Sequence, residues 1–156
     1  MLLVRATRRP CSEKFYEAST NMNIIRNILA VVAGFLIGGF VNMGILAAGH
    51  ALIPPPAGFD GSSMQGVAST IHLLRPIDFI GVFLAHALGP FVGVLSAMFI
   101  AASGRKTIAI ILGSLFFLGG IVANVMIPAP TWYRIVDLVF AYIPMAFLGW
   151  KVSRKG

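Results

Sequence analysis

Four long stretches of the chain are apolar almost without interruption, and polar or charged residues separate them. They run from Ile24 to Leu52, from Ile77 to Ala102, from Thr107 to Met126 and from Tyr133 to Trp150. A helix rises about 1.5 Å per residue, so about 20 residues cross the roughly 30 Å hydrocarbon layer of a membrane. Because lipid offers no water to backbone groups, segments of this length are expected to be helical. The pattern predicts an all-α fold, an integral membrane bundle of four transmembrane helices.

The first 21 residues are polar and basic and stand outside this pattern. At Met22 the sequence takes the form of a short membrane-protein start. We therefore expect residues 1–21 to be a basic cytoplasmic tail or to precede the true start, with residues 22–156 as a single transmembrane domain. A cleaved signal peptide is the competing interpretation, because Gly49 and Ala51 resemble a cleavage site. The preceding apolar stretch is longer than the roughly 7 to 15 residues of a signal core, which argues against cleavage.

The connection over residues 53–76 is the only sizeable one between the predicted helices. Its triple proline, Pro54 to Pro56, favours an extended start. Ser62 and Ser63 are helix caps by residue type, and apolar residues then recur at helical spacing until a proline ends the pattern. We expect a short amphipathic helix from Met64 to Leu74 that lies on the membrane surface.

Lysine and arginine are distributed unevenly between the two sides of the predicted bundle. One side holds ten of them, and the other side holds only Arg75 and Arg134. The ten are Arg5, Arg8, Arg9, Lys14, Arg26, Arg105, Lys106, Lys151, Arg154 and Lys155. Cytoplasmic flanks of membrane helices are enriched in these residues. The bias predicts that both termini are cytoplasmic and that the loop over residues 53–76 faces the opposite side.

The composition agrees with a membrane environment. Hydrophobic residues make up 58% of the chain and charged residues 11%, against about 45–50% and about 25% in soluble domains. The net charge is +7, but the basic residues sit at segment ends and form no stripe. The lipid bilayer is therefore the expected partner, and nucleic acid is not. Cys11 is the single cysteine, which excludes an internal disulfide and a multi-cysteine metal site.

No motif of enzyme chemistry is present in the sequence. It has no nucleotide-binding loop, nucleophile elbow, HExxH pair or CxxC. Histidine is a common axial ligand of haem, but the predicted depths of His50 and His86 differ, whereas two ligands to one iron need nearly the same level. We therefore expect no cofactor, no metal site and no enzymatic activity.

Small residues recur at four-residue spacing in the predicted helices. They are Gly81, Ala85, Gly89, Gly93, Ala97 and Ala101 in the second helix, Gly34 and Gly38 in the first, and Gly113 and Gly120 in the third. Such rows let another helix approach closely, so that dispersion acts where lipid offers no hydrophobic drive. Asn42 and Asn124 continue two of these faces. We expect both to point toward partner helices and to form interhelical hydrogen bonds.

Ionisable residues of the predicted helices gather in the outer half of the bilayer, where charge is expensive and therefore informative. We hypothesise an outward-facing polar pocket. Its predicted members are Asp78, His86, Arg134 and Asp137, with Asn42, Asn124 and Tyr142 as further contributors. His86 lies deepest and is the residue type that titrates near neutral pH. The competing interpretation is structural: Arg134 pairs with Asp137 or Asp78 and only fixes the register of the helices.

Two prolines lie beside the predicted pocket. Pro90 cannot bond to the carbonyl of His86, and Pro144 cannot bond to that of Phe140, because proline has no amide hydrogen. Each would free a backbone acceptor near the polar residues. Ordinary kinks, which membrane helices tolerate, are the simpler interpretation.

Several short motifs carry a resemblance to other proteins. They are Asn42-Met43-Gly44, Pro54-Pro55-Pro56 with Asp60, Ala85-His86-Ala87-Leu88-Gly89, Pro130-Thr131-Trp132, and Asp137-Leu138 followed by Ala141-Tyr142-Ile143-Pro144. In these the chain resembles a set of small four-helix bacterial inner-membrane proteins of unknown function, over roughly Met22 to Lys151. The resemblance implies a bacterial inner membrane and no catalytic activity. Residues 1–21 have no counterpart in that set.

Two functional hypotheses follow. The first is a non-enzymatic accessory or assembly protein that binds a membrane-protein partner, or a second copy of itself, through its small-residue faces and outer loop. The second is a small oligomeric transporter or channel with a proton-linked polar site at His86 and Asp137. The second hypothesis requires an oligomer, because four helices can hardly enclose a wide path.

Overall fold

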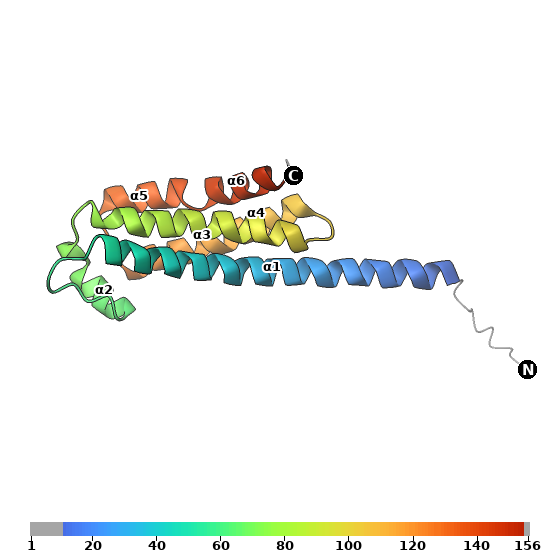
Figure 1. Ribbon diagram of the computed structural model, residues 1–156, viewed down its shortest axis with the longest axis horizontal. Helices are drawn as coiled ribbons and strands as arrows, with labels where there is room; N and C mark the ends of the chain where they lie inside the picture. The colour runs from blue at the N-terminus through green and yellow to red at the C-terminus, as the bar shows by residue number, and fades with distance from the viewer. Residues whose placement is uncertain (1–10, 155–156) are drawn as a thin grey trace, which may run out of the picture.

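The computed structural model describes the backbone of residues 11–154 and the side chains of residues 19–154. Within that part of the chain every regular element is helical, as the all-α prediction requires. The elements are α1 (Cys11–Leu52), α2 (Met64–Thr70), the 3-10 helix η1 (Ile71–Leu73), α3 (Asp78–Ile100), α4 (Arg105–Met126), α5 (Thr131–Phe140) and α6 (Ile143–Ser153). Figure 1 shows α1, α3, α4 and the α5–α6 pair running along one axis, with α2 at one end.

Four segments of the described chain are long and apolar enough to cross a membrane. They are Ser19–Leu52, Asp78–Ile100, Arg105–Met126 and Thr131–Ser153, the last of which combines α5 and α6. Large apolar side chains cover the outside of the bundle; Phe40, Phe99 and Val125 are each 77% exposed. Such a surface suits hydrocarbon and is unfavourable in water. The prediction of four membrane-spanning segments is confirmed at the level of length and composition.

The first helix begins earlier than the apolar pattern predicted. The expected start was Ile24, but α1 begins at Cys11, and only residues 1–10 of the predicted tail lie outside the described residues. Between Cys11 and Asn23 the sequence contains no glycine or proline, so no residue there interrupts helical hydrogen bonding. The apolar pattern locates the membrane layer and not the helix end. As a result α1 projects beyond the rest of the bundle (Figure 1).

The fourth predicted helix, Tyr133 to Trp150, is interrupted. α5 ends at Phe140, and the backbone of Tyr142 (φ −103°, ψ −72°) departs from helical values before α6 begins. Pro144 explains the interruption, because its ring nitrogen has no hydrogen for the Phe140 carbonyl. Pro90, by contrast, lies inside a continuous α3. The two prolines therefore differ in effect, and only the second one divides its helix.

The connection between α1 and α3 contains the short helix expected there, divided into α2 and η1. Ser63 caps α2, since its hydroxyl accepts a hydrogen bond from the Gly66 amide at 3.0 Å. The Asp60 carboxylate accepts hydrogen bonds from the amide and the hydroxyl of Ser62, at 2.9 and 2.6 Å. These bonds hold the pKa of Asp60 below its ordinary value. The loop is thus ordered by its own side chains.

Facing small residues join α1 to α3. The close pairs are Gly34 with Gly93 and Ala97, Gly38 with Gly89, and Gly49 with Gly81. A Cβ atom added at Gly38 would lie 2.7 Å from the carbonyl oxygen of Gly89, so only glycine permits this approach. Asn42 lies on the same seam, against Gly89. The rows of small residues predicted from the sequence of α1 and α3 therefore form contacts inside the bundle.

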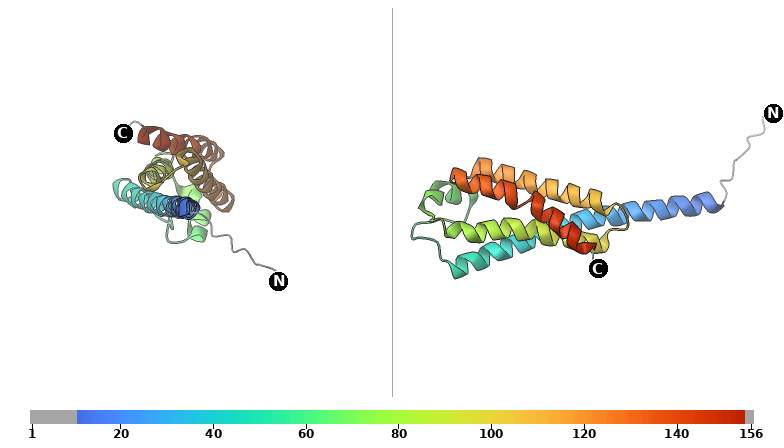
Figure 2. Two further views of the ribbon diagram at one scale, coloured as in Figure 1. Left: turned by 90° about the vertical axis from the view of Figure 1, so that its right-hand side faces the viewer. Right: turned by 90° about the horizontal axis from the view of Figure 1, so that it is seen from above.

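The centre of the bundle is an apolar core on both sides of α3, which contacts α1, α4 and α6 (Figure 2). Val94, Met98 and Leu112 are each less than 2% exposed. On the far side of α4, Gly113 lies against Ala146 of α6. These residues form a close-packed apolar layer between the described helices.

The two ends of the bundle differ in the connections that they carry. The loop end carries residues 53–77 and 127–130, and the turn end carries residues 101–104. At the turn end, the Asn27 side chain of α1 accepts hydrogen bonds from the amides of Ala102 and Ser103, at 3.0 and 3.3 Å. These bonds satisfy backbone groups where α3 stops, and they fasten α1 to the tight α3–α4 connection.

Candidate functional site

A buried carboxylate, Asp137 of α5, lies at the centre of the polar residues near the loop end. Its side chain is 0% exposed. One oxygen, Oδ1, lies 2.9 Å from Nδ1 of His86 and accepts a hydrogen bond from the Tyr133 hydroxyl at 3.3 Å. The other, Oδ2, accepts a hydrogen bond from the Tyr142 hydroxyl at 3.1 Å. A buried carboxylate is tolerated only with such partners, and all three come from side chains of the bundle.

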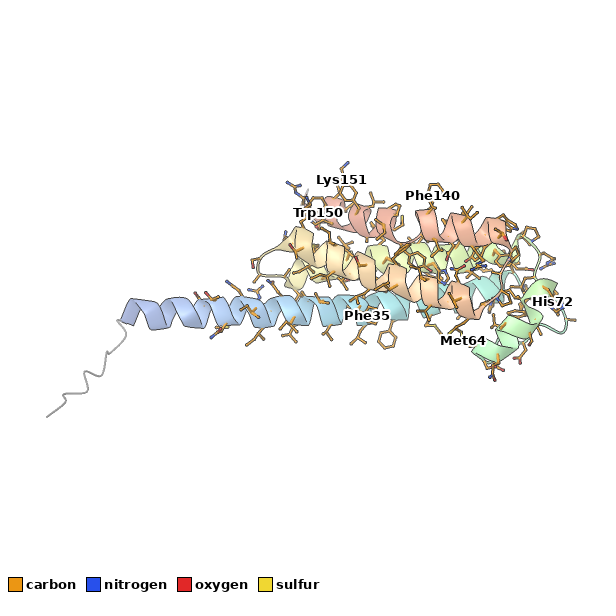
Figure 3. The ribbon with its side chains drawn as sticks, turned by 180° about the vertical axis from the view of Figure 1, so that it is seen from behind. Phe35, Met64, His72, Phe140, Trp150 and Lys151 are labelled. Atoms are coloured by element: carbon orange, nitrogen blue, oxygen red, sulfur yellow. The ribbon has the colours of Figure 1, made fainter. Side chains whose placement is uncertain are left out.

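Three parts of the fold assemble this cluster. Tyr133 and Asp137 are four residues apart on α5 and therefore share one face. Tyr142 lies in the break between α5 and α6, where the non-helical backbone brings its hydroxyl back to the carboxylate. His86 comes from α3, and its ring centre lies 5.6 Å from that of Tyr142. Phe140, beside the break, points away from the bundle (Figure 3).

A cavity of about 400 Å³ lies above the cluster, beneath the loop. Its walls come from the end of α1, the loop with α2 and η1, and the loop-end parts of α3, α4 and α5. Most of the lining is apolar, including Met43, Phe59, Val67, Ile71 and Ile127. Met64, labelled in Figure 3 at the loop end, also belongs to this wall. A pocket of this size and character suits a small apolar ligand.

The polar residues that line the cavity are His50, Ser62, Ser63, His86, Asn124, Tyr133 and Asp137. His86 and Asp137 lie farthest from the loop; His86 is eight residues, about 12 Å, inside the start of α3. The side chain of His86 is 24% exposed, whereas that of Asp137 is fully covered. His86 is therefore the member of the pair that a bound molecule can reach. Asn124 and His50 also line the cavity, nearer its mouth.

The predicted pairing of Arg134 with a carboxylate is not what the structure shows. Arg134 donates from Nε to Oδ1 of Asn124 at 3.3 Å, and Asn124 in turn donates to the Gly120 carbonyl at 2.9 Å. Although Arg134 and Asp137 are three residues apart, the arginine is directed at α4 and the carboxylate at α3. Asn124 thus forms the interhelical bond that was expected of it.

Asp78 also takes a partner different from the expected one. Its carboxylate binds the Arg75 guanidinium at 2.8 and 3.1 Å and accepts the Arg75 amide at 2.7 Å. Arg75 reaches further, to the Pro54 carbonyl at 3.3 Å. This pair fixes the start of α3 to the loop and does not line the cavity. Of the hypothesised pocket, His86, Asp137 and Tyr142 form one cluster. Asn124 lines the cavity but bonds to Arg134, and Asp78 and Asn42 serve neighbouring contacts.

One member of the cluster escaped the sequence analysis. Tyr133 is not among the predicted members of the pocket, yet it is 5% exposed and its hydroxyl donates to Asp137. The four-residue spacing between Tyr133 and Asp137 was the available signal. Among residues 19–154, no three His, Cys, Asp or Glu side chains converge as a metal ion would require.

Comparison with known proteins gives no relative: no family model, no curated protein and no solved structure matches the chain.

Proposed function

We propose that this chain is a non-enzymatic membrane protein that binds a small, uncharged amphipathic molecule in the loop-end cavity. The observation that carries the proposal is the cavity itself: about 400 Å³, mostly apolar, with the His86–Asp137 pair in its wall. Apolar walls bind a hydrocarbon or ring system, and the imidazole offers one hydrogen bond to a polar head group. This combination is typical of binding sites in which a few polar groups set the orientation.

The charges around the cavity favour an uncharged ligand. Asp137 is already matched by His86 and two hydroxyls, so an added ligand charge would have no counterion there. Of the two arginines of the loop end, Arg75 forms an ion pair with Asp78 and Arg134 bonds to the neutral amide of Asn124; neither lines the cavity. An alcohol, amide or carbonyl head group meets these conditions better than a carboxylate or an amine.

For the location, we propose a bacterial inner membrane with both termini in the cytoplasm. The basic residues support this orientation: Arg26, Arg105, Lys106, Lys151 and Arg154 all lie toward the turn end. The loop end has only two arginines, both paired. By the positive-inside rule the loop end then faces the periplasm. The ligand would enter from that side or from the outer lipid leaflet.

In an accessory role, this chain would bind a protein partner through a different surface from the one that the sequence predicts. The sequence suggested partner binding through small-residue faces, but those of α1 and α3 contact each other. A protein partner would therefore meet the loop and the cavity mouth. The proposed role is to hold or present a ligand, and catalysis forms no part of it.

A photoreactive probe tests the proposal: a long-chain alcohol carrying a diazirine, added to the protein in lipid nanodiscs. We expect crosslinks on cavity residues such as Met64 and Val67. Val82→Trp, which fills the cavity, should remove most of them, and the matched change Phe99→Trp on the lipid-facing surface should not. Crosslinks spread over the lipid-facing surface, or insensitive to Val82→Trp, would contradict a binding cavity.

A second candidate function is a proton-linked transporter. The observation in its favour is the helix break next to Asp137, because discontinuous helices often surround transport sites. The core below the cluster is closed by Val94, Met98 and Leu112, so a path would have to form between copies. Binding by a single chain needs no such assumption, and we place it first.

A further inference from the structure

A second, shallower site lies at the turn end, on the outside of the bundle between α4 and α6. It is a groove of about 140 Å³, and its lining is apolar except for Lys106 and Ser114. The residues from Lys106 to Ser114 span about 12 Å along α4, so the groove follows the helix axis. Gly113 and Ala146 touch at its base, where neither helix has a bulky side chain. The break before α6 turns that helix away from the direction of α5 (Figure 2).

Cations surround one end of this groove. Lys106, in the first turn of α4, and Trp150 of α6 both line it. The Arg154 guanidinium carbon lies 5.0 Å from the centre of the Trp150 ring, so Arg154 is in contact with a residue that lines the groove. Trp150 and Lys151 appear together at this end in Figure 3. Lys151 and Arg105 lie at the same end of the bundle but do not line the groove.

No described acidic side chain balances these cations. The carboxylates among residues 19–154 are Asp60, Asp78 and Asp137, and all three lie toward the loop end. At the turn end, the charged side chains that the structure describes are all basic. They therefore attract an anion at the membrane surface. A phospholipid with an anionic head group has the two matching parts: an acyl chain for the apolar groove and a negative charge for the basic residues at its end.

We propose that the groove binds an anionic phospholipid, one acyl chain lying along α4 and α6 and the phosphate meeting Lys106 and Arg154. Tryptophan at the head-group level fits this arrangement, because its ring packs on the chain and its edge faces water. The lipid fills a surface groove between two helices that approach each other closely at Gly113 and Ala146. It thereby supports α6, the short helix beyond the break. This site is independent of the loop-end cavity and of any ligand there.

The test uses phosphatidylglycerol and phosphatidylcholine with identical acyl chains as probes, and native mass spectrometry of the full chain in detergent as the measurement. We expect phosphatidylglycerol to bind preferentially. Lys106→Gln with Arg154→Gln should weaken that preference by about fivefold for each residue removed, which corresponds to about 1 kcal/mol per basic side chain. Arg105→Gln with Lys151→Gln removes the same charge from outside the groove and should leave most of the preference.

A second pair of variants tests the apolar part. Ser114→Trp fills the groove and should reduce binding of the phospholipid, whereas Leu115→Trp, on the neighbouring lipid-facing position, should not. Equal binding of the two lipids by the unmodified chain would overturn the proposal. So would equal losses in the two charge-removing pairs, since that result assigns the effect to general surface charge.

Discussion

At the scale of single residues, the cluster around Asp137 holds a carboxylate that is fully buried. A carboxylate without solvent contact depends on its partners, and here they are one imidazole and two phenol hydroxyls. Removing one partner of a buried pair leaves the other uncompensated, which costs about 3–5 kcal/mol in other proteins. His86 and Asp137 should therefore depend on each other energetically.

A double-mutant cycle measures that dependence. We expect His86→Leu and Asp137→Leu each to destabilise the protein, and the double variant to lose about 1–3 kcal/mol less than the sum of the two. The physical reason is that the second substitution removes a group already left unpaired by the first. The free energy of unfolding from titration with sodium dodecyl sulfate in mixed micelles is the measurement.

An exposed histidine supplies the control for this cycle. His72, in η1, lies at the surface of the loop end (Figure 3) and has no contact with Asp137. His72→Leu combined with Asp137→Leu should be additive within about 0.5 kcal/mol. Additive behaviour of His86 and Asp137 as well would show that their 2.9 Å contact contributes no coupling.

At the scale of helices, a row of small residues and one proline account for most of the architecture. The α1–α3 seam could be predicted because spacing alone decides which residues share a helix face. The division of the fourth span could not be predicted from Pro144 alone, since Pro90 has the same chemistry and leaves α3 continuous. Whether a helix continues past a proline depends on what its neighbours offer, and the sequence does not contain that information directly.

Glycine substitutions test the seam. A Cβ at Gly93 would lie 2.6 Å from the Gly34 carbonyl oxygen, whereas a Cβ at Gly119 meets nothing within 4 Å. We expect Gly93→Leu to destabilise the protein by about 3 kcal/mol or to prevent folding, because the helices must separate. Gly119→Leu should be neutral or stabilising by up to about 1 kcal/mol, because leucine favours helix. Unfolding of both variants in mixed micelles decides it; equal stability would remove the packing argument.

At the scale of the whole molecule, sequence patterns locate the layers of the fold better than the partners of its polar groups. The four spans follow from apolar length, which is a property of the chain alone. The partner of Asp137 is different: Arg134 is nearer in sequence, but α5 directs the carboxylate at α3 and gives it His86. Pairing of this kind depends on how helices rotate about their axes, and small-residue rows fix that rotation only for the helices that carry them.

The proposed arrangement of the whole molecule has three parts: four spans, a ligand cavity that faces outward, and a basic end that faces the cytoplasm. Four spans that each cross the membrane would place the loop end and the turn end on opposite sides. We propose from the distribution of lysine and arginine that the turn end is the cytoplasmic one.

Labelling of single cysteines with a membrane-impermeant maleimide tests this claim most directly. With Cys11 replaced by serine, Ser62→Cys reports on the loop end and Ser103→Cys on the turn end; both positions are exposed. We predict that Ser62→Cys reacts in intact bacterial cells and that Ser103→Cys reacts only in inverted membrane vesicles. Reaction of both positions from the same side, or the reverse pattern, would contradict the account.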